Sequence, residues 1–427
     1  MSLELLSLIH SFLLAGALLG TWLIIGFYAV LAFYGYLYSR ESERSRRQMP
    51  TLTDWPAVSI LVPAHNEEIV MAGTIEALLH LDYPRDRFEV VVIDDSSTDR
   101  TRRVVEHIMS QDRRLKLVAI PEGLGGRGKS YALNVGLAHA AHDLIAVFDA
   151  DNTPEPQSLR YLVAEMSDDP RLAAAVGKVR TLNAHTNFLT RCIAIEFMSF
   201  QWMVQAGRWR LFGLASLPGT NYVIQREALE RAGSWDPSAI ADDAELTVRL
   251  SQEGYHIKFV PYAVTWEPEP QDWGVWLRQR LRWARGGTYV LRKFLPRLYR
   301  VRRRDLALEV LHLFTIYHLF FAVMMLSDFI LVSGVIAGIA VGARTSPLIV
   351  LWGLAIGVFL LEMAVALAIE GENTPTNLLI SAAMYFTYCQ AWIYVCAKAH
   401  YLDVVRQERL RWEKTIRVPG LVRTSGQ

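Results

Sequence analysis

Hydrophobic stretches lie toward both ends of this 427-residue chain, and a mixed, charged segment lies between them. Residues 11–38 carry no charged side chain, and this run is longer than the roughly 20 residues that cross a bilayer core. A second hydrophobic region runs from 306 to 399, with polar breaks at 342–347 and 370–377. The pattern therefore predicts membrane segments on both sides of a folded middle domain.

The N-terminal hydrophobic run is predicted to be a retained membrane anchor. No Lys or Arg precedes it, and it is longer than the apolar part of a cleavable signal peptide. Arg40, Arg44, Arg46 and Arg47 follow it directly. By the positive-inside rule, we expect the N-terminus outside and the next domain in the cytoplasm of a multi-pass protein of the plasma membrane.

The number of C-terminal spans stays open between three and four. Residues 348–369 and 378–397 each predict one span, whereas residues 306–341 fit either of two arrangements. One is an interfacial helix that leads into a single span, and the other is two spans that turn near Ser327 and Asp328. The basic tail predicts a cytoplasmic C-terminus, so the number of spans after the middle domain should be even, unless one segment is re-entrant.

The middle of the chain alternates short β-rich runs with helical patterns. Strands are expected at residues 58–62, 88–93, 115–120 and 143–148. Helices are expected at residues 66–80, 99–110 and 129–140. Such alternation is typical of an α/β domain with a buried, mostly parallel sheet, whose ligands bind beyond the carboxyl ends of the strands.

These patterns divide the chain into four predicted parts. The parts are an anchor with its basic flank (1–48), an α/β domain with interfacial helices (49–304), a membrane region (305–400) and a cytoplasmic tail (401–427).

Polar and acidic residues follow three of the predicted strands. The segments read PAHNEE at residues 63–68, DDSSTD at 94–99 and DADN at 149–152. Turn formation or helix capping explains any one such segment. Three of them at one edge of a parallel sheet favour a binding site instead.

Asp149 and Asp151 are alternate residues directly after an apolar strand. Two carboxylates so close repel each other unless a cation lies between them. Magnesium and manganese bind carboxylates together with substrate phosphates, so this pair predicts a Mg²⁺ or Mn²⁺ site for a diphosphate.

Composition and smaller motifs narrow the possible functions. The net charge of +1 argues against nucleic acid as a partner. Residues 123–130 match the short phosphate-loop pattern, but they follow the third strand, so nucleotide triphosphate hydrolysis is not favoured. Lys129, at a predicted helix start, is placed to meet a diphosphate. The three cysteines show no metal-ligand spacing.

Four ionisable residues lie inside the C-terminal apolar runs, and such groups are candidates for function inside a membrane. They are His312, His318, Asp328 and Glu362. A polar path for a glycan would use some of them, and packing pairs or a turn at Asp328 explain them equally well.

With these motifs assembled, residues 58–287 resemble the inverting family-2 glycosyltransferases of the GT-A (Rossmann-like) fold. The resemblance is strongest to membrane-integrated members such as the cellulose, hyaluronan and poly-N-acetylglucosamine synthases. The sequence QRLRW at residues 279–283 matches the family's Gln-x-x-Arg-Trp motif fully, and 149–151 matches its Asp-x-Asp motif. Ala241, Asp242 and Asp243 stand where the family commonly has Thr-Glu-Asp, with the last Asp retained.

The resemblance implies a role for individual residues. Asp243 is the expected base, which must reach the acceptor hydroxyl, and Asp149 and Asp151 are the expected metal ligands. The expected nucleotide-sugar contacts are Pro63, Ala64, Glu67, Asp94, Asp95, Lys129, Asp149, Gln279, Arg280, Arg282 and Trp283. The expected acceptor contacts are Gly219, Thr220, Asn221, Asp242 and Trp283.

The resemblance also implies a reaction. The chain is expected to be a metal-dependent hexosyltransferase that moves sugar from a UDP-sugar to a growing β-linked polysaccharide and couples synthesis to export, with an accessory export subunit as a possible partner. The alternative is transfer of one or a few sugars to a lipid acceptor. A third hypothesis, a transporter or scaffold with an inactive transferase domain, predicts loss of Asp149, Asp151, Asp243 or Arg282, and all four are present.

Overall fold

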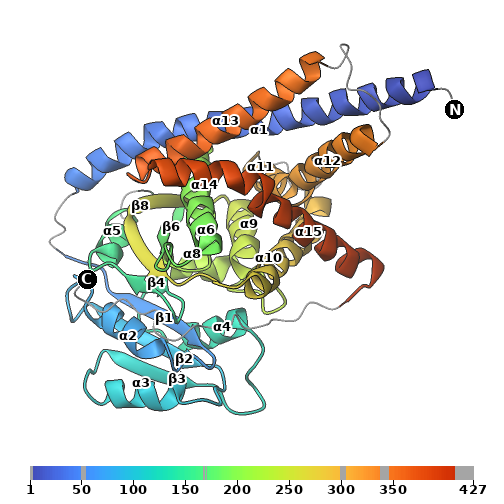
Figure 1. Ribbon diagram of the computed structural model, residues 1–427. Coiled ribbons are helices and arrows are strands. Elements are labelled where there is room, and N and C mark those ends of the chain that lie inside the picture. The colour runs from blue at the N-terminus through green and yellow to red at the C-terminus, as the bar shows by residue number, and fades with distance from the viewer. Residues whose placement is uncertain are drawn as a thin grey trace.

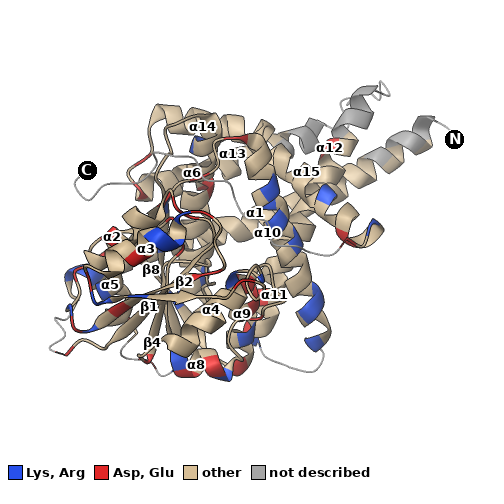
Figure 2. Ribbon diagram, turned by 90° about the horizontal axis from the view of Figure 1, so that it is seen from below, with Lys and Arg blue, Asp and Glu red and all other residues tan. Residues whose placement is uncertain are grey.

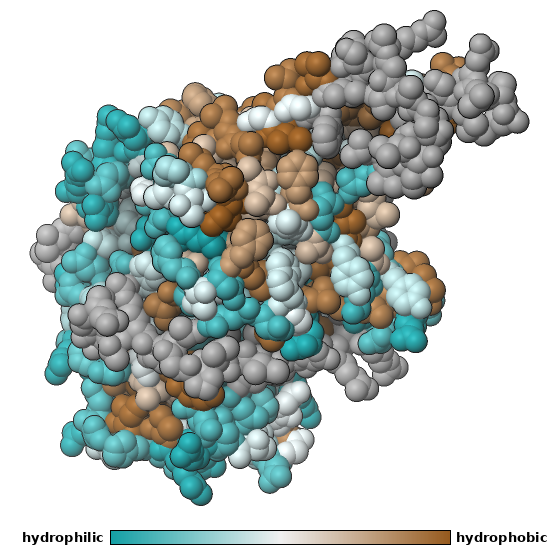
Figure 3. All heavy atoms as spheres, viewed as in Figure 1, coloured by the Kyte–Doolittle hydropathy of each residue, from teal (hydrophilic) through white to brown (hydrophobic). Residues whose placement is uncertain are grey.

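The protein consists of an α/β domain beneath a layer of long helices (Figure 1). The computed structural model describes residues 3–49, 54–166, 169, 171–298, 304–336 and 346–408. Figure 2 shows charged residues gathered on the α/β domain. Figure 3 shows hydrophobic atoms over the helices above it. The α/β domain is therefore the polar part of the molecule, and the layer of long helices is the apolar part.

The α/β domain is built on one sheet of eight strands in the order β3-β2-β1-β4-β7-β6-β8-β5. The strands are β1 (Val58–Ala64), β2 (Phe88–Asp94), β3 (Leu115–Ala119), β4 (Leu144–Val147), β5 (Thr153–Pro154), β6 (Leu172–Thr181), β7 (Tyr222–Gln225) and β8 (His256–Glu267). Strands β1 to β4 are mutually parallel, and so are β6 and β8, while β5 and β7 run antiparallel to their neighbours. The prediction of a mostly parallel sheet is confirmed.

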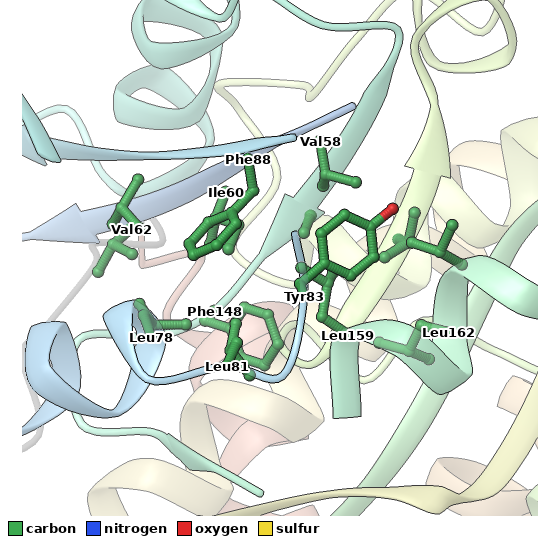
Figure 4. Close-up of a cluster of buried hydrophobic side chains, with 14 of the residues drawn as sticks. Val58, Ile60, Val62, Leu78, Leu81, Tyr83, Phe88, Phe148, Leu159 and Leu162 are labelled. Carbon is green, nitrogen blue, oxygen red and sulfur yellow. The ribbon is translucent and has the colours of Figure 1, made fainter. Parts of the chain in front are cut away.

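Each face of the sheet carries its own core because the strands are buried on both sides. In β1, Val58, Ile60 and Val62 join one core and Leu61 joins the other. Figure 4 shows the first core, where Phe88 and Leu78 pack beside Ile60. Helices α2 (Met71–Leu79), α3 (Thr101–Met109) and α5 (Ser158–Ala164) cover this face, and α4 (Lys129–His139), α8 (Arg226–Arg231) and α9 (Asp242–Glu253) contribute to the other.

Helix α2 begins five residues later than predicted. Asn66 lies in the left-handed region with φ of 56°, and its Oδ1 accepts hydrogen bonds from the backbone N–H groups of Thr98 and Asp99. Asn tolerates this conformation better than most residues. The segment after β1 therefore forms a loop tied to the end of β2 rather than a helical turn.

The upper layer contains long helices from both ends of the chain. They are α1 (Leu3–Arg47), α11 (Arg304–Phe314), η3 (Thr315–Leu319), α12 (Phe320–Ile336), α13 (Ser346–Ile369), α14 (Pro375–Phe386), α15 (Tyr388–His400) and η4 (Tyr401–Val405). Within the described ranges, three helices are long and apolar enough to cross a membrane, namely 11–47, 304–330 and 375–405, and residues 353–369 form a shorter apolar helix.

The structure decides between the two arrangements left open for residues 306–341. Helix α12 continues through Ser327 and Asp328, so the alternative with two spans that turn there is excluded. The predicted span 378–397 lies within the candidate membrane helix 375–405, which has a local break at Thr387, where α14 ends and α15 begins. Most of the predicted break at 342–347, and tail residues from Arg409 onward, lie outside the described residues.

Close contacts join the helical layer to the α/β domain. The Tyr38 hydroxyl of α1 donates a hydrogen bond of 2.6 Å to the Phe259 carbonyl of β8. The carboxylate of Glu370, after α13, pairs with Lys178 at 2.6 Å and with Arg180, both on β6. These bonds fix the membrane helices relative to the strand ends.

Candidate active site

The carboxyl ends of the strands form one side of a cavity of about 650 Å³. The ends of β1 and β2 are joined, because the Asp95 N–H donates to the Ala64 carbonyl at 2.8 Å. Most predicted site residues line this cavity: Pro63, Ala64, Glu67, Asp95, Lys129, Asp149, Asp151, Gly219, Thr220, Asp242, Asp243, Gln279, Arg282 and Trp283. Residues far apart in the sequence thus meet where the parallel-sheet rule places a ligand.

Lys129 joins three of the segments around the cavity. It is the first residue of α4, and its ammonium donates to Asp149 Oδ1 at 2.5 Å and to the Gly219 carbonyl at 2.7 Å. Gly219 has φ of 87°, and a Cβ there would lie 3.3 Å from Asp243 Oδ2. Burial acts to lower the pKa of Lys129, but the negative charges of Asp149 and Asp242 outweigh it and raise the pKa.

Asp242 and Asp243 form the N-terminus of α9, where the helix dipole favours negative charge. Burial raises the pKa of Asp242 to about 6, and the charge of Lys129 opposes this shift. Burial also raises the pKa of Asp243, against the N–H of Ala244, Lys129 and Arg282. The site therefore holds two carboxyl groups that take up protons more readily than exposed ones do.

The loop before β7 is fixed to α9 by Thr247. The Thr247 hydroxyl accepts from the Leu217 N–H at 2.9 Å and donates to the Asp243 carbonyl at 2.8 Å. Gly219, whose carbonyl accepts from Lys129, lies two residues after Leu217. The two hydrogen bonds of Thr247 therefore hold this carbonyl close to Asp243.

The Asp149–Asp151 segment has the chemistry of a divalent-cation site. Asp149 N–H donates to the Thr220 hydroxyl at 3.0 Å, and Asp151 is buried. Burial, then the charges of Glu269, Asp151 and Asp149, hold the pKa of Glu267 well above its usual range, which marks an excess of negative charge. Among the described residues no group of three His, Cys, Asp or Glu side chains is arranged to hold a metal. The two aspartates therefore fit a cation that takes its other ligands from water and phosphate.

Helix α10 (Trp273–Phe294) carries Gln279, Arg282 and Trp283 into the cavity. The Asp272 carboxylate caps the helix by accepting from the Gly274 N–H at 2.8 Å. Further along, a Cβ on Gly286 would lie 2.7 Å from the Ala241 Cβ. Only a glycine allows this approach, which holds α10 close to the start of α9 and brings Arg282 within electrostatic reach of Asp243.

Arg280 does not line the cavity, so its predicted contact with the nucleotide-sugar is corrected. Its fully buried guanidinium donates to Glu196 Oε2 at 2.7 Å and lies 4.0 Å from the ring centroid of Trp283. It also donates to Gln279 Oε1 at 2.9 Å. Arg280 therefore supports two residues that do face the cavity.

Asp94 and Asn221 also lie outside the cavity lining. Asp94 Oδ1 accepts from the Ser97 N–H at 3.1 Å and so shapes the turn after β2. The Asn221 amide donates to the carbonyls of Lys178 and Ala263 and is fully buried. Both side chains satisfy backbone groups of the fold, which corrects their predicted ligand contacts.

Four acidic residues of the cavity are absent from the sequence prediction, namely Glu196, Glu267, Glu269 and Glu309. Two of them lie at the carboxyl end of β8. Glu267 is the last residue of β8, and Glu269 follows it by two positions. A usable signal exists, since two alternate carboxylates follow a long strand here just as Asp149 and Asp151 follow β4. The prediction missed them because it followed the motifs of the resemblance, which assign nothing to this turn.

The cavity extends between the helices of the upper layer. Its lining there includes Ile24, Tyr28, His312, Phe320, Phe359, Glu362, Trp392 and Ile393. Of the four ionisable residues in the apolar runs, His312 and Glu362 reach the cavity and Asp328 and His318 do not. The His318 ring nitrogen lies instead 2.9 Å from His400 Nε2.

Comparison with known proteins gives one family. Residues 56–286 match the family described as glycosyltransferase like family 2. The chain is 40% identical over 401 residues to the probable glycosyltransferase YdaM of Bacillus subtilis, covering 93% of this chain and 95% of that one. It is 36% identical over 239 residues to a β-monoglucosyldiacylglycerol synthase of Synechocystis, covering 55% of this chain and 48% of that one.

Two more distant similarities complete the comparison. A poly-β-1,6-N-acetyl-D-glucosamine synthase of Staphylococcus aureus is 27% identical over 266 residues, covering 62% of this chain and 63% of the relative. The structure of a mannosyltransferase from Pyrobaculum calidifontis, in complex with GDP-mannose and Mn²⁺, superposes with a TM-score of 0.55 at 23% identity. It covers 88% of this chain and 99% of that one, which shows a shared fold.

Proposed function

Since this chain belongs to the family-2 glycosyltransferases of the GT-A fold, we propose that it transfers sugar from a UDP-sugar to a growing β-linked polysaccharide, with inversion, at the cytoplasmic face of the plasma membrane. The observation that carries the proposal is the single cavity that links Asp243 to the membrane helices. An acceptor that enters this cavity reaches the reacting residues from one end and the membrane region from the other.

Asp243 is the proposed general base. Inversion needs one group that takes the proton of the acceptor hydroxyl as this hydroxyl attacks the anomeric carbon. Burial raises the pKa of the Asp243 carboxyl, which makes it a better proton acceptor than an exposed aspartate. The positive charges of Lys129 and Arg282 act in the opposite direction and favour the ionised form of the Asp243 carboxyl.

Lys129 and Arg282 are also the proposed partners of the leaving diphosphate. Both are cationic, line the cavity and lie near Asp243, so they stabilise negative charge that develops on the far side of the transferred sugar. A Mg²⁺ or Mn²⁺ ion held by Asp149 and Asp151 would supply further neutralisation of the diphosphate.

The membrane end of the cavity supports a glycan acceptor. Aromatic rings suit the apolar faces of sugars, and Tyr28, Phe359 and Trp392 line this part. Glu362 adds a carboxyl group among them. A chain that grows from Asp243 would pass these side chains on its way into the membrane, which is the reason for proposing coupled export and an accessory export subunit.

A lipid acceptor is the second candidate. Ile24, Met363 and Ile393 give the same end of the cavity an aliphatic surface that fits acyl chains. The similarity to β-monoglucosyldiacylglycerol synthases, at 34–36% identity, favours this candidate from a separate direction.

Product size separates the two candidates. The full chain in lipid nanodiscs is given radiolabelled UDP-sugars with Mn²⁺ or Mg²⁺, beside Asp243→Asn and the matched surface variant Asp86→Asn, whose side chain is 84% exposed. Label in long polymer that Asp243→Asn loses and Asp86→Asn keeps supports polysaccharide synthesis. Label only in organic extract would replace it with lipid glycosylation, and no transfer from any donor would overturn both.

A further inference from the structure

Glu267 and Glu269 are held at fixed positions in the cavity wall. The Leu182 N–H donates to the Glu267 carbonyl at 2.8 Å, next to the β6–β8 pairing. The buried Asn183 side chain makes two hydrogen bonds with the Glu269 backbone. It accepts from the N–H and donates to the carbonyl, each at 2.8 Å. Backbone bonds of this kind set the direction of both carboxyl groups before any ligand binds.

The Glu269 side chain has unused hydrogen-bonding capacity. The residue is 5% exposed and lines the cavity. Its carboxyl group shares a hydrogen bond with that of Glu267, but within the described chain its Oε2 atom has no hydrogen-bond partner. Arg280 is the cation that acts on it most strongly, yet its guanidinium gives its hydrogen bonds to Gln279, Glu196 and Tyr388. A buried carboxyl oxygen without a donor is costly, so this atom is suited to receive a donor from a ligand.

The position of Glu267 and Glu269 in the cavity indicates which part of a ligand they contact. Glu267 accepts from the Asn152 amide at 3.1 Å, directly after the Asp149–Asp151 segment that faces the diphosphate. On the other side, Glu269 lies near Arg280, which supports Gln279 and Trp283. The pair thus lies between the predicted diphosphate end and the predicted acceptor aromatic. We therefore expect the transferred sugar in this interval.

We propose that Glu267 and Glu269 form a hydroxyl-binding subsite for the transferred sugar, with Glu269 as the direct contact. This deepens the proposed function and rests on it. Carboxylates accept hydrogen bonds from sugar hydroxyls, and four acidic residues, Asp149, Asp151, Glu267 and Glu269, stand close together here. A uronate carboxylate offers no hydrogen-bond donor to the Glu269 oxygen that lacks a partner, so we expect the enzyme to take neutral hexoses or N-acetylhexosamines in preference to uronic acids.

Binding of donor analogues tests the subsite. The full chain in nanodiscs is titrated by calorimetry with UDP, UDP-glucose, UDP-N-acetylglucosamine and UDP-glucuronate, and with UDP-glucose lacking one hydroxyl at C2, C3, C4 or C6. The variants are Glu269→Gln, Glu269→Ala and the surface control Glu253→Gln, an exposed residue at the end of α9. Thermal unfolding of each variant establishes that it is folded.

For the wild type, we expect one deoxy-donor to bind about 10- to 100-fold more weakly than UDP-glucose. For Glu269→Ala, the same deoxy-donor and UDP-glucose should bind equally well, because the variant already lacks the carboxyl group that the missing hydroxyl would contact. UDP itself should bind all variants alike, and UDP-glucuronate should bind the wild type more weakly than UDP-glucose. Equal deoxy penalties in wild type and Glu269→Ala, or preferred binding of the uronate, would overturn the subsite.

Transfer assays on the same samples keep this inference separate from the proposed function. A wild type that binds donors with the expected pattern but transfers none would sink the proposed function and leave the subsite intact. A wild type that transfers sugar while Glu269→Ala keeps every deoxy penalty would sink the subsite alone.

Discussion

Lys129 and Asp149 form an ion pair in which the ammonium nitrogen lies 2.5 Å from a carboxylate oxygen. The same ammonium reaches the carbonyl of Gly219, beside Asp243. One cation therefore lies among the first aspartate of the Asp-x-Asp motif, the loop before β7 and the proposed base. We expect it to move little between this arrangement and contact with a diphosphate.

Replacing Lys129 by Met should lower kcat/KM for sugar transfer by about 100- to 1,000-fold, the usual effect of removing one charge-stabilising group from an active site. The variant also leaves Asp149 and Asp242 without their nearest cation. Steady-state kinetics with a labelled UDP-sugar measures the change. Lys116→Met, on the edge strand β3 with its side chain 48% exposed, is the matched control. Equal activity in both variants would contradict this role of Lys129.

The transfer rate should fall as the pH is lowered into the range in which the proposed base Asp243 takes up a proton, and burial shifts this range upward from that of an exposed aspartate. Burial raises the pKa of Asp242 to about 6 and raises that of Asp243, and the base must be ionised to accept a proton. Asp242→Asn removes a negative neighbour, which should lower the pKa of Asp243 and move the acid limb to lower pH. A pH–rate profile of wild type and variant tests this. An acid limb that stays in place would show that Asp242 does not influence the base.

The same raised pKa values predict how the free energy of unfolding changes with pH. A carboxyl whose folded pKa lies above its unfolded pKa stabilises the fold below the unfolded pKa, and this contribution is lost as the pH rises through the folded value. For Asp242 the window is from about 4 to about 6. Unfolding of Asp242→Asn should therefore depend less on pH than unfolding of the wild type in this window. Equal dependence would refute the buried, protonatable state of Asp242.

Metal removal should abolish transfer and leave the fold intact. Among the described residues no group of three His, Cys, Asp or Glu side chains could hold a metal ion, so we expect Asp149 and Asp151 to bind the ion together with the donor diphosphate. EDTA should stop transfer, and Mn²⁺ or Mg²⁺ should restore it in the wild type but not in Asp151→Asn. Thermal unfolding without nucleotide should be the same with and without EDTA. Transfer that continues in EDTA would remove the metal from the proposal.

Arg280→Met should lower stability by about 3–5 kcal/mol, because it leaves the Glu196 carboxylate without its buried partner. It should also reduce kcat, since the guanidinium no longer supports the ring of Trp283, while UDP affinity stays near that of the wild type. Denaturant unfolding and UDP titration separate these effects. A large loss of UDP affinity would instead show that Arg280 contacts the nucleotide-sugar directly.

Gly35→Ala should destabilise the joint between α1 and the α/β domain by about 1–3 kcal/mol. A Cβ at this position would lie 1.9 Å from the Trp202 carbonyl oxygen, so the helix must move away. Gly16→Ala on the same helix meets nothing within 4 Å and serves as the control. Thermal unfolding in detergent compares the two, and equal melting temperatures would contradict the close crossing.

The sequence by itself determined the four strands β1 to β4 and the residues at their ends, whereas β5 to β8 were not predicted. Apart from Ser59 and Glu89, residues 58–62 and 88–93 are apolar, and such runs are typical of strands buried on both faces. Because parallel strands share one carboxyl edge, the same pattern placed Asp95, Asp149 and Asp151 together. These conclusions depend on neighbours in the chain, which a sequence displays directly.

The tertiary structure alone decided which side chains face the ligand. Arg280 and Arg282 are two residues apart on α10, so they point about 200° away from each other, and either one matches a phosphate contact in sequence. Packing against Glu196 of α6 (Phe188–Ser199) takes Arg280 out of the cavity and turns Arg282 into it. Glu269 enters the site because Asn183 of another segment fixes its backbone. Contacts between distant segments set these directions, and no local pattern encodes them.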